Sequence, residues 1–177
     1  MGLSVPIASG IMLIAFTISA SMLLQTMIVQ TQTLTQMIDW CAAEEADRLE
    51  VALELNIISI KASGDRTVNI NLTLRNTGSK TIFLLQNKTL EFRNDVIVAY
   101  NSSAATWISQ PIDHYDVLEV RVTNTEIVMD PTSHPYLNPG EEALIQLSVD
   151  GLESGSILVV VFVSHYGVTA KAEGVVP

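Results

Sequence analysis

The sequence predicts an N-terminal transmembrane helix that continues into a stalk, followed by an all-β, immunoglobulin-like antiparallel sandwich. Three observations predict this fold. No charged side chain precedes Asp39 in the 177-residue chain. Beyond about residue 50, apolar residues recur with a period of two, which is the period of a β-strand. Turn residues separate these runs, with no amphipathic helices between them. We therefore expect a membrane helix and stalk over residues 1–49 and an extracytoplasmic β domain over residues 50–177.

Residues 7–29 are long and apolar enough to cross a bilayer. Thirteen of these 23 residues are Ile, Leu, Met, Phe or Val. A helix of this length spans roughly 35 Å, and the hydrocarbon core of a bilayer is about 30 Å thick. Inside hydrocarbon the backbone must satisfy its own hydrogen bonds, so a helix is expected. The side chains assigned to the span include Ile7, Ile11, Ile14, Ile18, Leu23 and Val29.

The span also carries a candidate helix-packing face. Ala8, Ala15 and Ser19 lie on one side of the expected helix, where small side chains let two backbones approach closely. The only cysteine, Cys41, cannot form an internal disulfide; it is either a free thiol or pairs with Cys41 of a second copy. A homo-oligomer is therefore one expected arrangement.

The span is expected to be retained as an anchor in the cell membrane. It lacks the basic n-region of a secretory signal peptide and exceeds the usual apolar length of 7–15 residues. We expect the short N-terminus to lie inside the cell and the large domain to lie outside. Long domains cross the membrane largely regardless of their charge. Three glycosylation sequons in the β domain, at Asn71, Asn87 and Asn101, agree with this orientation.

The helix is expected to run on beyond the membrane to about Arg48. Leu34 and Ile38 keep the four-residue spacing of a helix face. Trp40 marks the outer membrane interface, where tryptophan is enriched, or alternatively lies on the surface of the exposed stalk.

The β domain is predicted from short apolar runs separated by turns. The stretch TVNINLTLR alternates strictly, so its four apolar side chains point to the core and Asn71 points to water. Residues 157–163 are apolar on both faces, as expected of a central strand, and residues 101–116 are expected to form a long loop. The predicted strands cover residues 53–62, 67–75, 79–86, 90–100, 116–129, 142–150, 156–165 and 167–174.

The sequence predicts no catalytic residue, no metal site and no cofactor. The three histidines lack metal-ligand spacing, no glycine-rich phosphate loop follows a strand, and no serine nucleophile elbow occurs. Glu141 and Glu142 follow a turn and are expected to be a solvated pair rather than a catalytic acid and base. The net charge of −10 argues against nucleic acid as a partner, because phosphate repels an acidic surface.

A sandwich without catalytic residues acts through its loops or edge strands. Within the expected loop, Trp107, Pro111 and Tyr115 form a candidate contact patch, because aromatic side chains are enriched at protein interfaces. The alternative is that Trp107 packs beneath the loop.

Two features together resemble a known family. The opening MGLS leads directly into an uncharged span, and LTLRNTGSKTIFL is followed later by LNPGEEALIQLSV. These features resemble the accessory proteins F and G of the archaeal flagellum (archaellum), relatives of archaellin, and the opening is more similar to protein F. The resemblance implies a static motor component. It also implies that the membrane, other archaellum components and the surface-layer protein are its partners.

Two other functions stay open at this stage. LSVPIASGIMLIAF also resembles the start of a processed pilin, which would make the chain a filament subunit whose helices bundle as the core. Pilin-type leaders carry Lys or Arg before the cleaved glycine, whereas only Met1 precedes Gly2 here. The third possibility is a membrane-tethered adhesin or receptor domain.

Overall fold

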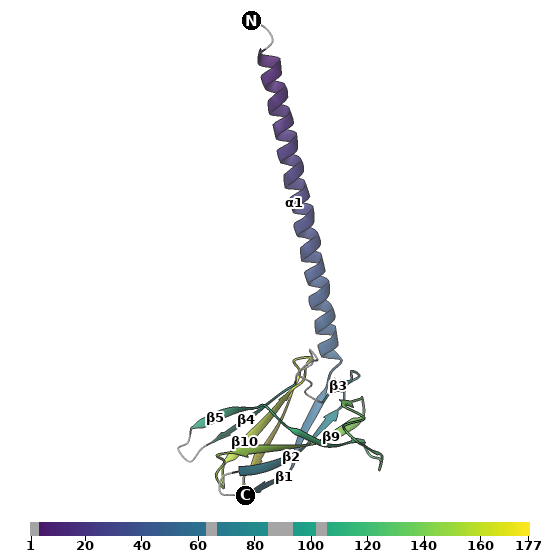
Figure 1. Cartoon of the computed structure of the whole chain (residues 1–177), viewed down its shortest axis with the longest axis vertical. Helices are drawn as coiled ribbons and strands as arrows, with labels where there is room; N and C mark the ends of the chain where they lie inside the picture. Colours follow the sequence, from purple (N-terminus) through teal and green to yellow (C-terminus); the bar gives the residue numbers. More distant parts are fainter. Residues whose placement is uncertain (1–3, 63–66, 85–93, 102–105) are drawn as a thin grey trace. The chain divides into compact units, whose positions relative to one another are not determined.

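The computed structural model describes residues 4–62, 67–84, 94–101 and 106–177. It contains one helix, α1 (Ser4–Leu49), and eleven strands within these residues (Figure 1). The chain forms two compact units, Met1–Glu45 and Ala46–Pro177. The first unit is helical, and the second holds all the strands together with the last turn of α1.

Helix α1 confirms that the expected span continues into a longer helix. Its 46 residues correspond to a length of about 69 Å. Apolar side chains lie all around its circumference from Ile11 to Val29, and they are exposed in the isolated chain. The helix ends at Leu49, one residue beyond the expected end at Arg48.

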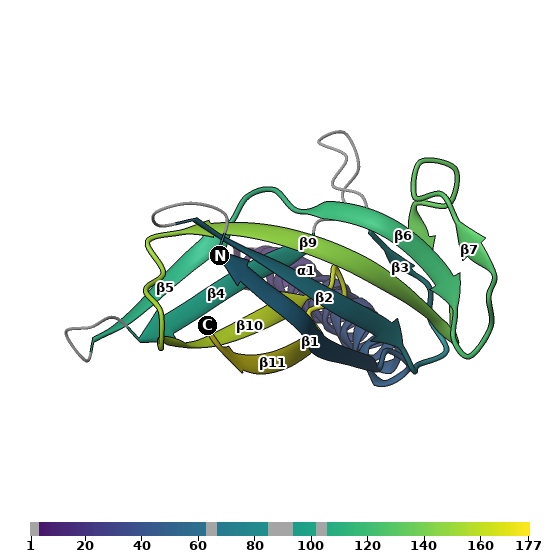
Figure 2. The same cartoon turned by 90° about the horizontal axis from the view of Figure 1, so that it is seen from below.

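The β unit is a sandwich of two antiparallel sheets with a short additional ribbon (Figure 2). The five-stranded sheet has the order β1-β2-β9-β6-β7, the four-stranded sheet has the order β11-β10-β4-β5, and β3 pairs with β8. The strands are β1 (Leu53–Ala62), β2 (Thr67–Asn76), β3 (Ile82–Phe83), β4 (Asp95–Asn101), β5 (Trp107–Ile112), β6 (Asp116–Val122), β7 (Val128–Met129), β8 (Tyr136–Leu137), β9 (Glu141–Asp150), β10 (Ile157–Val163) and β11 (Thr169–Val175).

Alternation along the strands builds one core between the two sheets. On β2 every second residue is buried and the residues between are half-buried. The same alternation on β9 and β10 places Ile145 and Phe162 in the core, each about 1% exposed. One side of the sandwich is closed where the side chains of Ile57 and Ile60 from β1 reach Gly174 on β11. A Cβ at Gly174 would lie only 2.9 Å from the Ile60 Cδ1 atom, so the absence of a side chain permits this approach.

Three sequence expectations need correction. The expected loop over residues 101–116 contains strand β5, which forms the edge of the four-stranded sheet. A proline is tolerated there because an edge strand need not donate every amide hydrogen bond. The expected strand 116–129 is divided into β6 and β7 by a turn in which Asn124 has a φ of 61°. The expected strand 79–86 contains only the two residues of β3 as strand within its described part.

Candidate anchoring and interaction surfaces

The apolar part of α1 is the first candidate surface. Among the described residues, α1 is the one helix whose length and composition would allow it to cross a membrane. Ile11, Ile14, Ile18, Leu23 and Val29 are each more than half exposed. The side chain of Ile7 lies outside the described residues, and Ala8, Ala15 and Ser19 are exposed on the helix. These assignments to a membrane span and to a packing face stay predictions.

The hydroxyl groups on α1 are satisfied by the helix itself. Seven hydroxyl groups between Thr17 and Thr35 donate to a backbone carbonyl one turn earlier, for example Thr17 to Leu13 at 2.9 Å and Ser21 to Thr17 at 2.7 Å. Back-bonding of this kind lets serine and threonine enter hydrocarbon without an unpaired donor. The first half of α1 is therefore compatible with lipid despite its hydroxyl groups.

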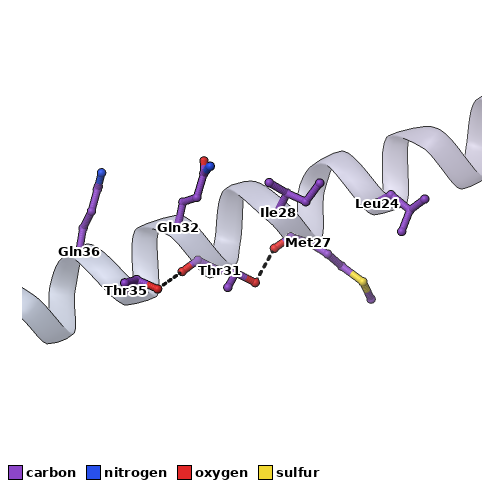
Figure 3. A pocket seen from close by; sticks show the side chains of 7 residues that line it. All are labelled: Leu24, Met27, Ile28, Thr31, Gln32, Thr35 and Gln36. Atoms are coloured by element: carbon purple, nitrogen blue, oxygen red, sulfur yellow. Dashed lines mark hydrogen bonds between the residues drawn. The ribbon is translucent and has the colours of Figure 1, made fainter.

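The middle of α1 changes from apolar to polar along two rows of side chains (Figure 3). Leu24 and Ile28 are followed by Gln32 and Gln36 in one row, and Met27 is followed by threonines in the other. The Thr31 hydroxyl donates to the Met27 carbonyl oxygen at 2.8 Å. The segment QTQTLTQ, residues 30–36, has one apolar residue among seven. It is better suited to water than to hydrocarbon.

The segment that follows α1 is fastened to the turn after β2. The amides of Thr77 and Gly78 donate to the carbonyl oxygen of Ala52 at 2.9 and 3.1 Å. A Cβ on Gly78 would lie 2.4 Å from the Ala52 nitrogen and 2.5 Å from the Glu50 carbonyl oxygen. Because no side chain can approach backbone atoms so closely, only glycine fits at this position.

Lys80 adds ionic contacts to the same junction. Its Nζ atom lies 2.9 Å from Oδ1 of Asp47 and 3.5 Å from Oε2 of Glu50. The hydrogen bond with Asp47, followed by the attraction of Asp47 and Glu50, raises the pKa of Lys80. Asp47 belongs to the last turn of α1, so this turn is held within the β unit.

The two sequence motifs that carry the family resemblance meet in space. Asn76 is fully buried, and its amide nitrogen donates to the carbonyl oxygens of Lys80 at 2.7 Å and Leu137 at 2.9 Å. In return, the Gly140 amide donates to the Asn76 carbonyl oxygen at 2.9 Å. Gly140 has a φ of 79°, which a type II turn after Pro139 requires. These motifs therefore hold the junction and the β8–β9 turn together.

The outer face of the five-stranded sheet is a ladder of polar side chains, here called the polar face. Thr67 donates to Asp150 at 2.7 Å, and Ser148 donates to Asn69 at 2.9 Å. Further contacts join Asn71 to Ser59 and Gln146 at 3.2 Å each, and Arg121 to Glu142 at 2.9 Å. Its apolar members are Leu144, Val128 beside Arg121, and two residues in irregular pairings, Ile58 and Leu118. The polar face is thus suited to contact with water.

The outer face of the four-stranded sheet is apolar at its centre, which we call the valine face. Polar or charged residues surround this centre, namely Asp95, Asn101, Ser109, Thr169, Lys171 and Glu173. The strand pairings place its side chains in rows, with Val159 between Ala99 and Glu173 and with Val161 between Ile97 and Lys171. The central side chains are half-buried. The valine face is centred on Ile157, Val159, Val161, Val163, Ile97 and Ala99.

The three residues of the expected contact loop have different positions. Trp107 is 56% exposed on β5, so it does not pack beneath a loop. Pro111, also on β5, is exposed beside Ile97 at the margin of the valine face. Tyr115 is 7% exposed, and its hydroxyl donates to the Leu84 carbonyl oxygen at 2.6 Å; burial raises its pKa. Tyr115 is therefore a core residue and cannot belong to a contact patch.

The sequons differ in their surroundings. Asn71 points outward on β2, as expected, but its amide nitrogen donates to the Ser59 hydroxyl and its oxygen accepts from Gln146. A glycan on Asn71 would have to replace the first of these bonds. Asn101 is half-buried at the end of β4, and Asn87 lies outside the described residues. Glycosylation at these positions stays a prediction.

Glu141 corrects the expectation of a solvated glutamate pair. It is 7% exposed, and its Oε2 atom accepts from the Asn138 amide at 2.7 Å and lies 2.9 Å from the His134 Nε2 atom. Burial raises the pKa of Glu141, but the hydrogen bonds from His134 and Asn138 outweigh burial, and the pKa is lowered overall. Glu142 faces outward and contacts Arg121. Glu141 thus holds the β8–β9 turn.

The histidines and the cysteine lie apart from one another in the described part of the chain. His114 is exposed, 3.4 Å from an oxygen of Asp116. The ring of His165 packs against Tyr166, with ring centroids 4.2 Å apart, and burial lowers its pKa. Cys41 is an exposed free thiol. No three His, Cys, Asp or Glu side chains in the described part of the chain gather closely enough to hold a metal ion.

Comparison with known proteins identifies the family. The model of the archaeal-type flagellin family matches residues 2–174. The chain belongs to the archaeal-type flagellin family. It is accordingly a structural, non-enzymatic component of the archaellum, and the expected family resemblance is confirmed at this level. No protein of curated function matches the sequence.

Solved structures agree with this family in their fold. The archaeal flagellum of Methanospirillum hungatei strain JF1 superimposes with a TM-score of 0.55 at 13% identity, covering 96% of this chain and 92% of that chain. This likeness confirms an N-terminal helix followed by an antiparallel sandwich. The archaellum periplasmic stator protein FlaG from Sulfolobus acidocaldarius matches with a TM-score of 0.39 and 20% identity, covering 70% of this chain and 100% of that chain. The stator complex of FlaF and FlaG from Sulfolobus acidocaldarius matches with a TM-score of 0.40 and 19% identity, covering 68% of this chain and 88% of that chain.

Proposed function

We propose that this chain is a stationary, membrane-anchored component of the archaellum motor that ties the motor to the cell envelope. One observation carries the proposal: the side chains of α1 change from apolar to polar along the helix. An apolar first half is followed by the polar segment 30–36 and then by the first charged residue, Asp39. A helix buried along its whole length in a filament core would have to pair the glutamine amides of that segment, whereas a stalk in water would not.

The length of α1 is consistent with this division. A bilayer core takes about 20 residues of a helix. The remaining residues of the 46-residue helix extend for about 39 Å. We propose that this part forms the stalk, with a short N-terminus inside the cell and the sandwich outside.

The junction after α1 supports a mechanical role. A stator must transmit torque between two fixed points without yielding at the connection. Backbone hydrogen bonds to Ala52, the glycine-only position at Gly78 and the ionic contacts of Lys80 fasten the last turn of α1 to the β unit. For the second fixed point we propose the surface-layer protein, with other archaellum components as neighbours.

Deletion of this chain from its host tests the proposal. We expect cells that still carry filaments but do not swim, because a stator is needed for rotation and not for assembly. Electron microscopy counts the filaments, and tethered-cell microscopy measures rotation. Re-expression of the natural chain restores swimming, whereas a variant with residues 30–36 replaced by leucine and isoleucine does not restore it fully. Cells that lack filaments altogether would contradict the stator function.

A filament subunit is the second candidate function. It is favoured by the superposition of the Methanospirillum hungatei filament structure on 96% of this chain, helix included. In that case the chain would be abundant in filaments sheared from cells. A stator would instead stay with the membrane fraction, so quantitative mass spectrometry of the two fractions separates the candidates.

A further inference from the structure

We propose that the outer part of α1 is a docking site for an amphipathic helix of a different protein, one that carries basic side chains. Four apolar residues form one side of this part of α1, which we call the stalk face: Leu34, Met37, Ile38 and Cys41. Their spacing of i, i+3, i+4 and i+7 is that of one side of an amphipathic helix. The opposite side is polar and includes the row of Gln32 and Gln36 shown in Figure 3.

The stalk face is exposed. Leu34, Met37 and Ile38 each expose more than half of their surface, and Cys41 is an exposed free thiol. Trp40 follows Met37 by one turn and borders the face, and it is exposed as well. Contiguous exposed apolar side chains mark interaction sites on protein surfaces, and aromatic residues are enriched there.

Lipid does not cover the stalk face in the arrangement of the proposed function, on which this inference rests. The headgroup region extends about 5–7 Å beyond each side of the hydrocarbon core. Along the helix, Leu34 lies about 8 Å and Cys41 about 18 Å beyond Val29, where the apolar span ends. The stalk face therefore stands beyond the headgroups, and a protein partner is needed to cover it.

The row of side chains along this face ends in a charge. Leu34, Ile38 and Cys41 are followed by Glu45, with alternating spacings of four and three residues. Parallel helices meet along rows of this spacing. Two copies anchored in one membrane are parallel, so their pairing would place Glu45 of one copy opposite Glu45 of the other. Like charges in these positions disfavour a second copy as the partner.

The charge of the stalk selects the chemistry of the partner. Residues 30–48 contain four acidic side chains, at positions 39, 44, 45 and 47, against the single basic side chain of Arg48. A helix with Lys or Arg opposite Glu45 would combine an ion pair with burial of the apolar row, as complementary interfaces do. The stalk face is therefore suited to an amphipathic helix whose apolar row is flanked by basic residues.

The β unit limits the site at its far end. Arg48 is the next residue in the row, and its Nη2 atom lies 3.6 Å from the position of a Cβ on Gly167, in the turn between β10 and β11. The site thus extends from Leu34 to Glu45, about three turns of helix. A contact of this length is weak by itself. A partner anchored in the same membrane would gain from the raised effective concentration.

Thiol labelling of isolated host membranes tests the inference, because Cys41 is the only cysteine of the chain and lies in the docking row. The labelling rate with a maleimide is divided by the rate for the same chain purified in detergent, which removes differences in intrinsic thiol reactivity. We expect labelling to be about tenfold slower in the membrane, because a site about nine-tenths occupied reacts only through its open fraction. The matched control combines Cys41→Ser with Ala43→Cys. It moves the thiol to the opposite side of α1, where no slowing is expected.

Charge reversal tests the chemistry of the partner. Glu45→Lys sets like charges opposite each other and should raise the labelling rate of Cys41 in the membrane to its rate in detergent. Asp39→Lys makes the same change of charge on the opposite side and should leave Cys41 protected. Circular dichroism verifies that each variant is folded. Oxidation of the same membranes with copper phenanthroline should give no disulfide between Cys41 residues of two copies.

The outcomes separate this inference from the proposed function. Equal rates for Cys41 in membrane and detergent would overturn the inference and leave the stator function standing. A Cys41–Cys41 disulfide would assign the face to a second copy, and protection that survives Glu45→Lys would exclude a basic partner; either result overturns the inference. Slow labelling at both Cys41 and Ala43→Cys would mean that this part of α1 is buried on all sides, which contradicts the stalk and the proposed function as well. Protection of Cys41 alone that Glu45→Lys releases and Asp39→Lys does not would support the docking site.

Discussion

The two outer faces of the sandwich are built from strands of the same alternating pattern, but their side chains differ. On the polar face, Asn69, Asn71 and Gln146 form cross-strand hydrogen bonds with their neighbours. On the valine face, the central positions are aliphatic, and charged residues lie around them, namely Asp95 on β4 and Lys171 and Glu173 on β11. Both faces are compatible with the same core, so the core did not dictate either surface. The difference between them is therefore a property of the surfaces and does not follow from the packing of the core.

The largest expected effect on folding stability concerns strand β10. Its inner side chains pack in the core, whereas its outer side chains belong to the valine face. Phe162→Ala removes a core side chain and is expected to lower the free energy of unfolding by about 3–5 kcal/mol. Val161→Ala, one residue away on the valine face, should lower it by less than about 1 kcal/mol in the monomer. Denaturant unfolding of the full-length chain in detergent measures both. Equal effects would mean that the valine face is already packed within the chain.

The next effect concerns the one carboxylate on the inner side of β9. Glu141→Gln removes a buried charge that accepts hydrogen bonds, and should destabilise the chain by about 1–3 kcal/mol at neutral pH. The pKa of Glu141 is lowered in the folded state, so its stabilisation is fully present above its unfolded pKa and disappears as the pH falls through the folded pKa. The stability difference between the natural chain and the variant should therefore shrink in acid.

Glu142→Gln is the matched control for this pH effect, because Glu142 points outward to Arg121 in a partly exposed ion pair. Such pairs contribute only about 0–1 kcal/mol. Thermal unfolding between neutral and acidic pH compares the two variants. A Glu142 effect as large as that of Glu141 would contradict the distinction between a buried and a surface carboxylate.

The smallest effect compares the two outer faces directly. Asn71→Ala breaks hydrogen bonds to Ser59 and Gln146 and should cost about 0.5–1.5 kcal/mol of folding stability. Val159→Thr places a hydroxyl on the valine face and should change folding stability by no more than about 0.5 kcal/mol. Denaturant unfolding of the two variants measures both effects. A larger loss of stability in Val159→Thr than in Asn71→Ala would contradict the distinction between the two faces.

The regular parts of the fold were predictable because local patterns determine them. The strict alternation of residues 67–75 and the continuous helix up to Arg48 needed no tertiary information. Strand β5 was missed because asparagine, serine and proline around it are typical of loops, and only its position at a sheet edge makes a proline acceptable. The sheet order, in which β9 lies between β2 and β6, depends on long-range packing that no local pattern contains.

The candidate surfaces were only partly predictable. The apolar run of residues 157–163 was a correct signal for a central strand, but the sequence alone could not say that one side would face outward as the valine face. The buried pair of His134 and Glu141 was missed because neither residue follows an apolar pattern. The available signal was the turn at Asn138, which lies between His134 and Glu141 in the sequence. A turn of this kind brings the residues before and after it close together. Tyr115 was misassigned because an aromatic residue near polar neighbours is consistent with either a surface or a core position.

Thiol labelling in intact cells tests the central claim most directly, namely that the sandwich lies outside the membrane. With Cys41 replaced by serine, Ser148→Cys provides a single exposed thiol on the polar face. The account predicts that a membrane-impermeant maleimide reacts rapidly with this thiol in intact cells. No reaction in intact cells, together with a rapid reaction after lysis, would contradict the external location.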